Sequence, residues 1–145
     1  MLTLSFALFA LLGCLVLTAV TAVHVTVRNA ALDAAVDLLD AGGAGTLEFQ
    51  TAASAEVATL TFSATAFGAA SSGSATANAI TNDTSATGSA SPITKAVFKN
   101  NAGTALWTVT VTATGGGGDI ELPATTIGAG ATVGLSSLVA NAPNP

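Results

Sequence analysis

The sequence predicts an all-β fold: a jelly-roll-like antiparallel β-sandwich of about eight strands, preceded by one short helix and an apolar N-terminal segment. From Gly45 onward, apolar and small polar residues alternate with a period of two, which is typical of strands with one buried face. Clusters of Gly, Asn, Ser and Pro separate these runs and are typical turn signals. A chain of 145 residues has room for one hydrophobic core. We therefore expect an apolar segment over residues 1–24 and a single β-sandwich domain over residues 25–145.

The N-terminal segment carries no charged side chain from residue 2 to residue 27 if His24 is neutral. Such a run exceeds the roughly 20 residues that a helix needs to cross a bilayer. Several interpretations stay open: a secretory signal with a small-residue cleavage site at 20–22, a lipoprotein signal at Cys14, a retained membrane helix, or a hydrophobic arm inserted into a partner. A non-native extension before a true start near Val23 is a further alternative.

One short helix is expected over residues 29–41. Asn29 is a suitable N-cap, strong helix formers follow it, and Gly42 with Gly43 supplies a C-terminal stop. Apolar residues at helical spacing form a stripe, and three aspartates repeat the same spacing on the adjoining face: Asp33, Asp37 and Asp40. Carboxylates one turn apart usually form a solvated face, so we do not interpret them as a metal site.

Strands are expected at eight places in the remaining chain: 46–51, 56–63, 74–80, 93–99, 104–114, 119–122, 125–127 and 131–140. The clearest is 104–114, where threonine alternates with apolar residues. The glycines at 115–118 are interpreted as a flexible hairpin connection. Two long loops, 64–74 and 81–92, are expected to carry contacts, because loops on a rigid β framework commonly do.

The composition argues against catalysis and against nucleic-acid binding. The net charge is −5, and the basic residues are Arg28, Lys95 and Lys99, whereas phosphate binding needs clustered basic side chains. One cysteine, Cys14, cannot form an internal disulfide, and one histidine, His24, cannot supply a two-imidazole site. We therefore expect no catalytic residues, no metal and no cofactor.

Candidate interaction residues lie in the two long loops. Phe67 and Gly68 place a bulky ring at a turn, where it can anchor a loop to a neighbouring molecule. Asn82 and Asp83 form a turn signal in the second loop. The other aromatic residues fall at inward strand positions and are interpreted as core.

Several segments resemble small structural proteins that tailed bacteriophages encode beside their head and tail genes. The resemblance spans roughly residues 25–140 and is carried by four stretches of sequence: Asn29-Ala-Ala-Leu-Asp33, Ala64-Thr-Ala-Phe-Gly-Ala-Ala70, Thr76-Ala-Asn-Ala-Ile80 and residues 119–138. Members of this family resemble capsid cement or decoration proteins with a jelly-roll fold. The resemblance implies a non-enzymatic virion protein of the phage head, which contacts the major capsid protein and neighbouring copies of itself as a homo-oligomer.

Other functions remain open from the sequence. A phage tail or head-fibre component would fit the same resemblance. The apolar run over residues 2–27 favours a membrane-anchored or extracellular β-sandwich module, similar to a pilin or an adhesin, and leaves membrane association open. A carbohydrate-binding jelly roll or a glycan hydrolase rests on fold analogy alone.

Overall fold

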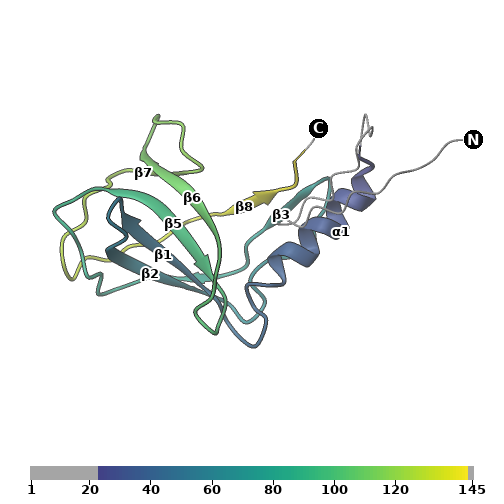
Figure 1. Cartoon of the computed structure of the whole chain (residues 1–145), viewed down its shortest axis with the longest axis horizontal. Coiled ribbons are helices and arrows are strands. Elements are labelled where there is room, and N and C mark those ends of the chain that lie inside the picture. The colour runs from purple at the N-terminus through teal and green to yellow at the C-terminus, as the bar shows by residue number, and fades with distance from the viewer. Residues whose placement is uncertain (1–22, 144–145) are drawn as a thin grey trace, which may run out of the picture.

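The protein is mainly β. The computed structural model describes residues 23–143, which form one helix and eight strands (Figure 1). In chain order they are α1 (Val25–Val36), β1 (Thr46–Thr51), β2 (Glu56–Phe62), β3 (Ser74–Thr76), β4 (Ile80–Thr81), β5 (Ile93–Lys99), β6 (Ala105–Ala113), β7 (Ile120–Leu122) and β8 (Val139–Asn141). The predictions for residues 1–22, including every interpretation of the apolar segment, lie outside the described residues.

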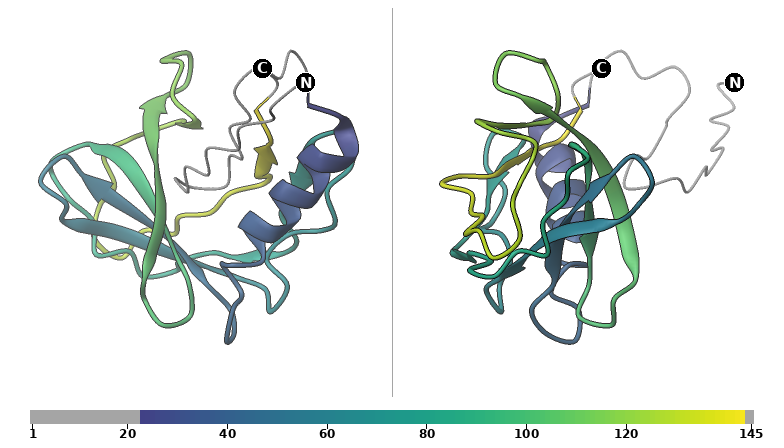
Figure 2. Two further views of the ribbon diagram at one scale, coloured as in Figure 1. Left: turned by 45° about the vertical axis from the view of Figure 1, so that its right-hand side comes forward. Right: turned by 90° about the vertical axis from the view of Figure 1, so that its left-hand side faces the viewer.

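Six strands form one curled sheet in the order β4-β2-β1-β5-β6-β7 (Figures 1 and 2). Its register puts apolar side chains opposite one another on the inner face, because side chains that are paired across strands point to the same side. One inner row joins four residues from β2, β1, β5 and β6: Leu60, Leu47, Phe98 and Trp107. A second joins Ala58, Phe49, Ala96 and Val109. The period-two pattern of the sequence is thus confirmed as an alternation between a buried and a more exposed face.

A thinner second layer covers part of this core. It contains the two-stranded sheet of β3 and β8 and the loops around residues 82–92 and 123–138. These loops meet through isolated bridges between Asp83 and Val133 and between Ser89 and Ile127. Val133 is buried and Ile127 packs on the core, so the loops complete a sandwich-like fold.

Three expected strands differ from the structure. The run 74–80 divides into β3 and β4, which pair in different sheets, because residues 77–79 leave β8 and cross to the edge of β2. Residues 125–127 and most of 131–140 form single bridges rather than ladders, and only Val139–Asn141 is a strand. Glycine at three positions between 128 and 134 interrupts the alternation there.

The helix begins earlier and ends earlier than expected. His24 is the N-cap, since its Nδ1 accepts a hydrogen bond of 3.2 Å from the backbone N–H of Thr26. Asn29, the expected cap, instead accepts a hydrogen bond of 2.8 Å from the backbone N–H of Gly73. After Val36 the chain continues in turns, and Gly42 and Gly43 adopt positive φ angles of 85° and 134°. The expected apolar stripe is nevertheless present, since three residues are buried: Leu32, Val36 and Leu39.

The edge strand β7 pairs with β6 in parallel, whereas the other ladders among the described residues are antiparallel. The expected hairpin at 115–118 is therefore wrong: residues 114–119 turn back beside β6 and begin β7 in the same direction. Parallel strands usually need a connection of about a dozen residues. Here glycine makes the shorter path feasible, with positive φ angles at Gly115 and Gly117. Both backbone N–H groups donate to the Glu121 carboxylate, at 3.1 and 2.9 Å.

Candidate interaction surfaces

The solvent side of the large sheet is an almost neutral, hydrogen-bonding surface, which we call the outer face. Its register places ten residues on this side, of which two are buried, five are half-buried and three are exposed: Gln50 and Val97; Thr46, Glu48, Thr59, Lys95 and Lys99; Thr61, Thr108 and Thr110. Thr61, Thr108 and Thr110 are exposed, as the alternation in 104–114 predicts for its threonines. Five of the ten residues are threonines and three are charged, namely Glu48, Lys95 and Lys99, so hydroxyl and methyl groups outnumber charges on this face.

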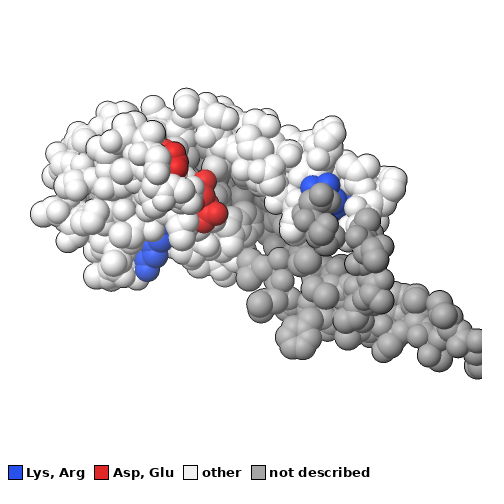
Figure 3. Space-filling model, turned by 90° about the horizontal axis from the view of Figure 1, so that it is seen from above, with Lys and Arg blue, Asp and Glu red and all other residues white. Residues whose placement is uncertain are grey.

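The basic side chains of the chain are engaged within the protein itself. Lys99 forms a salt bridge with Glu48 on the outer face. Lys95 donates a hydrogen bond of 2.7 Å to the hydroxyl of Ser54. Arg28 donates one of 3.0 Å to the carbonyl oxygen of Ala142. Figure 3 accordingly shows charged side chains as a small part of the face that it draws. Contacts made by these surfaces must therefore depend mainly on hydrogen bonds and apolar burial.

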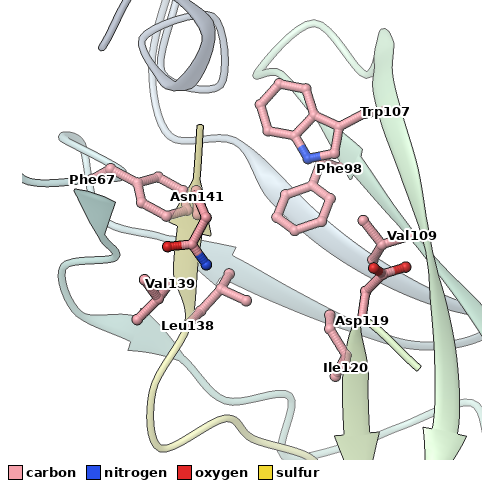
Figure 4. Close-up of a pocket in the computed structure, with 10 residues that line it drawn as sticks. Phe67, Phe98, Trp107, Val109, Asp119, Ile120, Leu138, Val139 and Asn141 are labelled. Carbon is pink, nitrogen blue, oxygen red and sulfur yellow. The ribbon is translucent and has the colours of Figure 1, made fainter. Parts of the chain in front are cut away.

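A groove opens between β6 and β8, with a volume of about 350 Å³. One wall carries aromatic and aliphatic side chains of the large sheet, and the other carries β8 with Phe67 (Figure 4). Phe98 and Trp107 stack with ring centroids 5.1 Å apart. Val139, at the rim, is 47% exposed. The groove can accept an apolar segment.

Strand edges border this groove. β7 pairs with β6 only at Val111–Ala113, so the preceding half of β6 has no strand partner on that side within the described chain. β8 pairs with β3 on one side, and the described residues supply no strand on its other side. Unpaired backbone groups at such edges can bind another extended segment.

Phe67 and Gly68 lie at this groove, but not as an exposed anchor. Phe67 is 5% exposed, lines the groove, and packs on Phe62 with a centroid distance of 5.9 Å. The backbone N–H of Gly68 donates a hydrogen bond of 2.9 Å to the carbonyl oxygen of Thr76, the last residue of β3. The ring therefore holds residues 66–68 against the core, and only its groove side is open to a further segment.

Asn82 and Asp83 lie elsewhere, beside β2. Asp83 accepts hydrogen bonds of 2.9 Å from the backbone N–H groups of Thr59 and Ser85. Its own backbone exchanges hydrogen bonds of 2.9 and 2.8 Å with Val133. Asn82 is exposed and lies over Gly134, where a Cβ atom would meet the Asn82 amide. The structure thus does not bring the four predicted residues into one site.

Two aspartates of the helical region accept hydrogen bonds from a distant loop, which the sequence did not predict. Asp33 accepts a hydrogen bond of 2.6 Å from the backbone N–H of Ala70, and Asp40 accepts one of 2.7 Å from that of Ala66. Their interpretation as a purely solvated face is wrong, although Asp37 is exposed as expected. The three aspartates have the same spacing as the apolar stripe and each follows one of its residues directly. This spacing could have indicated that Asp33 and Asp40 face the protein.

Three carboxyl groups have depressed pKa values. Partial burial by itself would raise the pKa of Glu48, but hydrogen bonds from Lys99 and Gln50 and the charge of Lys99 outweigh it. Hydrogen bonds from the Thr110 side chain and backbone lower the pKa of Asp119. Those from the Gly115 and Gly117 backbone lower the pKa of Glu121. All three shifts favour the ionised form, so these groups stabilise local structure at neutral pH.

The described residues contain no group of three or more His, Cys, Asp or Glu side chains arranged to hold a metal ion. Over the same residues, the helix is neither long enough nor apolar enough to cross a membrane. Comparison with known proteins gave no matching family model, no matching curated protein and no matching solved structure.

Proposed function

We propose that this protein is a non-enzymatic structural component of a phage virion, and specifically a capsid cement or decoration protein. In this role it binds the major capsid protein and neighbouring copies of itself, and it stabilises the head. The resemblance of residues 25–140 to small phage structural proteins supports this function. The observation that carries it is the outer face, with its threonine-rich surface and its internally neutralised lysine.

Such a surface favours protein association over binding to charged ligands. Side chains without charge can be covered by a partner at a lower desolvation cost than charged ones. Threonine hydroxyls can exchange hydrogen bonds with a partner's backbone, while their methyl groups are buried. Each contact is weak, but many copies on a regular lattice bind collectively.

The first test of this function is whether intact virions contain the protein. Purified virions are examined by mass spectrometry and cryo-EM, and we expect this chain on the shell at a copy number that matches lattice positions. Intact particles that lack the chain would refute the proposal.

A binding assay tests the outer face itself. Shells lacking the protein are incubated with the wild type or with the variant Thr61→Glu/Thr108→Glu, which places two charges on the outer face. We expect the variant to bind at least about tenfold more weakly, since two desolvated charges without partners oppose association. The matched control is Thr126→Glu/Thr132→Glu, because both threonines are exposed in the loop 123–138 and lie off the outer face. Equal loss in the control would show that net charge, not this face, controls binding.

A membrane-anchored or secreted surface module is the second candidate, favoured by the uncharged run over residues 2–27. In the structure, Val25–Val36 form α1, so residues 25–27 belong to the folded part of the chain. Within this run, the residues left for an anchor are those before Val25. Recovery of the full-length chain in the soluble fraction of expressing cells would argue against this function.

A further inference from the structure

Residues 2–22 and the groove between β6 and β8 have matching chemistry. The segment contains no charged residue and consists of apolar residues, glycine and a few Thr and Ser. The groove is walled mostly by apolar side chains, among them Trp107, Val109 and Leu138. Its one ionisable lining residue is Asp119. The Asp119 carboxylate accepts hydrogen bonds from the backbone N–H and the hydroxyl of Thr110, at 2.8 and 2.6 Å.

The start of the described chain lies beside the groove. Arg28, in the first half of α1, donates a hydrogen bond to the carbonyl oxygen of Ala142, the residue that follows β8. The backbone N–H of Ala142 donates a hydrogen bond of 2.8 Å to the carbonyl oxygen of Gly73. The N–H of Gly73 in turn donates one to the side-chain oxygen of Asn29, also in α1. These contacts fix the N-terminal half of α1 against the end of β8 (Figure 2). The described chain therefore begins next to one wall of the groove.

The length of the segment is sufficient. Only four residues separate Val23 from Arg28, and the last three of them belong to α1, so Val23 lies at most about 13 Å from Arg28. Upstream of Val23, even nine residues of extended chain reach about 30 Å, which brings Cys14 within range of the whole groove. A segment of the same chain needs no encounter with a second molecule, so its effective concentration at the groove is high.

From these three observations we infer that residues 2–22 bind in cis in the groove between β6 and β8, and cover Trp107 and Val139. The occupant is the chain's own apolar segment, which shields the aromatic wall and the rim from water. This inference does not depend on the proposed virion function, because it concerns the single chain.

The native Cys14 allows a direct test on the full-length protein. A benzophenone is attached to Cys14 through a maleimide and activated by light, and the cross-linked peptides are identified by mass spectrometry. We expect cross-links from Cys14 to residues that line the groove, recovered from the monomer band of a denaturing gel. The same cross-links in the dimer band alone would mean that a second copy supplies the segment, and would overturn binding in cis. Cross-links confined to other surfaces, or to lipid or detergent, would also overturn it.

A pair of matched variants separates groove binding from chance contact. Val139→Lys places a charge at the rim of the groove, and Val139 is 47% exposed, so the fold tolerates the change. Leu38→Lys is the control, since Leu38 is 52% exposed beyond the end of α1 and does not line the groove. We expect Val139→Lys to lower the yield of groove cross-links by about tenfold, because a charge opposes burial of an apolar segment, and Leu38→Lys to leave it unchanged. Equal yields in both variants would overturn the inference.

Discussion

The carboxylate of Asp40 accepts a hydrogen bond of 2.7 Å from the backbone N–H of Ala66, a fully buried residue 26 positions further along the chain. This bond ties the segment after α1 to the loop between β2 and β3. Asp33 makes the equivalent contact with Ala70, so two carboxylates hold one loop that carries Phe67. The loop is thereby fixed where it lines the groove.

Loss of this carboxylate should destabilise the fold. In Asp40→Ala the N–H of Ala66 stays buried without a partner, and we expect the free energy of unfolding to fall by about 1–3 kcal/mol. Urea denaturation measures the change. Asp37→Ala is the control, since Asp37 is exposed, and it should change stability by less than about 0.5 kcal/mol. Equal effects of both substitutions would contradict the role of the Asp40 contact.

Gly88 should not tolerate a side chain. Its φ angle is +72°, and a Cβ atom there would collide with the backbone of Gly128 and Ala129. We expect Gly88→Ala to cost about 3 kcal/mol or more, because the loops that cover the core must separate. Gly103→Ala is the matched control: its φ is +78°, but nothing lies within 4 Å of the added atom. Gly103→Ala should lower the free energy of unfolding by only about 1 kcal/mol, because it adds backbone strain but no collision. Thermal or urea unfolding of both variants measures the difference.

Acid should weaken the protein partly through Glu48. A carboxyl group whose pKa is depressed by folding contributes stability above its unfolded pKa, about 4.3 for Glu. That contribution is lost as the pH falls through the lower folded-state value. We expect the unfolding free energy to decline below about pH 4.3, and to decline less steeply in Glu48→Gln, which is also about 1 kcal/mol less stable at pH 7. Unfolding curves recorded from pH 7 to pH 2 test this, and identical slopes in the two proteins would contradict it.

Glu121 should control the connection between β6 and β7. Its carboxylate accepts hydrogen bonds from the backbone N–H groups of Gly115 and Gly117, so Glu121→Ala should expose both amides to solvent. We expect hydrogen exchange at these two glycines to accelerate several-fold, while amides of β1 and β5 in the middle of the sheet keep their rates. Unchanged exchange at Gly115 and Gly117 would show that the glycine backbone alone maintains the connection.

Local alternation in the sequence was enough to predict the strands that lie in the middle of the sheet. In β1, β2, β5 and β6, side chains alternate between the core and the outer face, and this alternation is visible in the sequence. The parallel pairing of β7 was not predictable in this way, because it depends on contacts between Glu121 and a glycine loop. The division of 74–80 into β3 and β4 likewise depends on which distant strands each half meets.

The groove could not be predicted from any single motif. Its walls come from β6 and β8, more than 25 residues apart in sequence, and from Phe67 in a loop. Phe67 was predicted to anchor a loop to a neighbouring molecule. In the structure it is buried, and its burial depends on the ring of Phe62 and on the loop contacts of Asp33 and Asp40. Sequence spacing cannot show that these segments converge.

The stack of Trp107 on Phe98 also provides an optical signal. Trp107 is the single tryptophan of the sequence, and its indole ring lies in the wall of the groove at 5.1 Å from the Phe98 ring. Its emission should therefore shift when the two rings separate, without interference from a second fluorophore of the same kind. Rapid-mixing experiments can thus follow refolding of this wall in real time, with no dye attached to the protein.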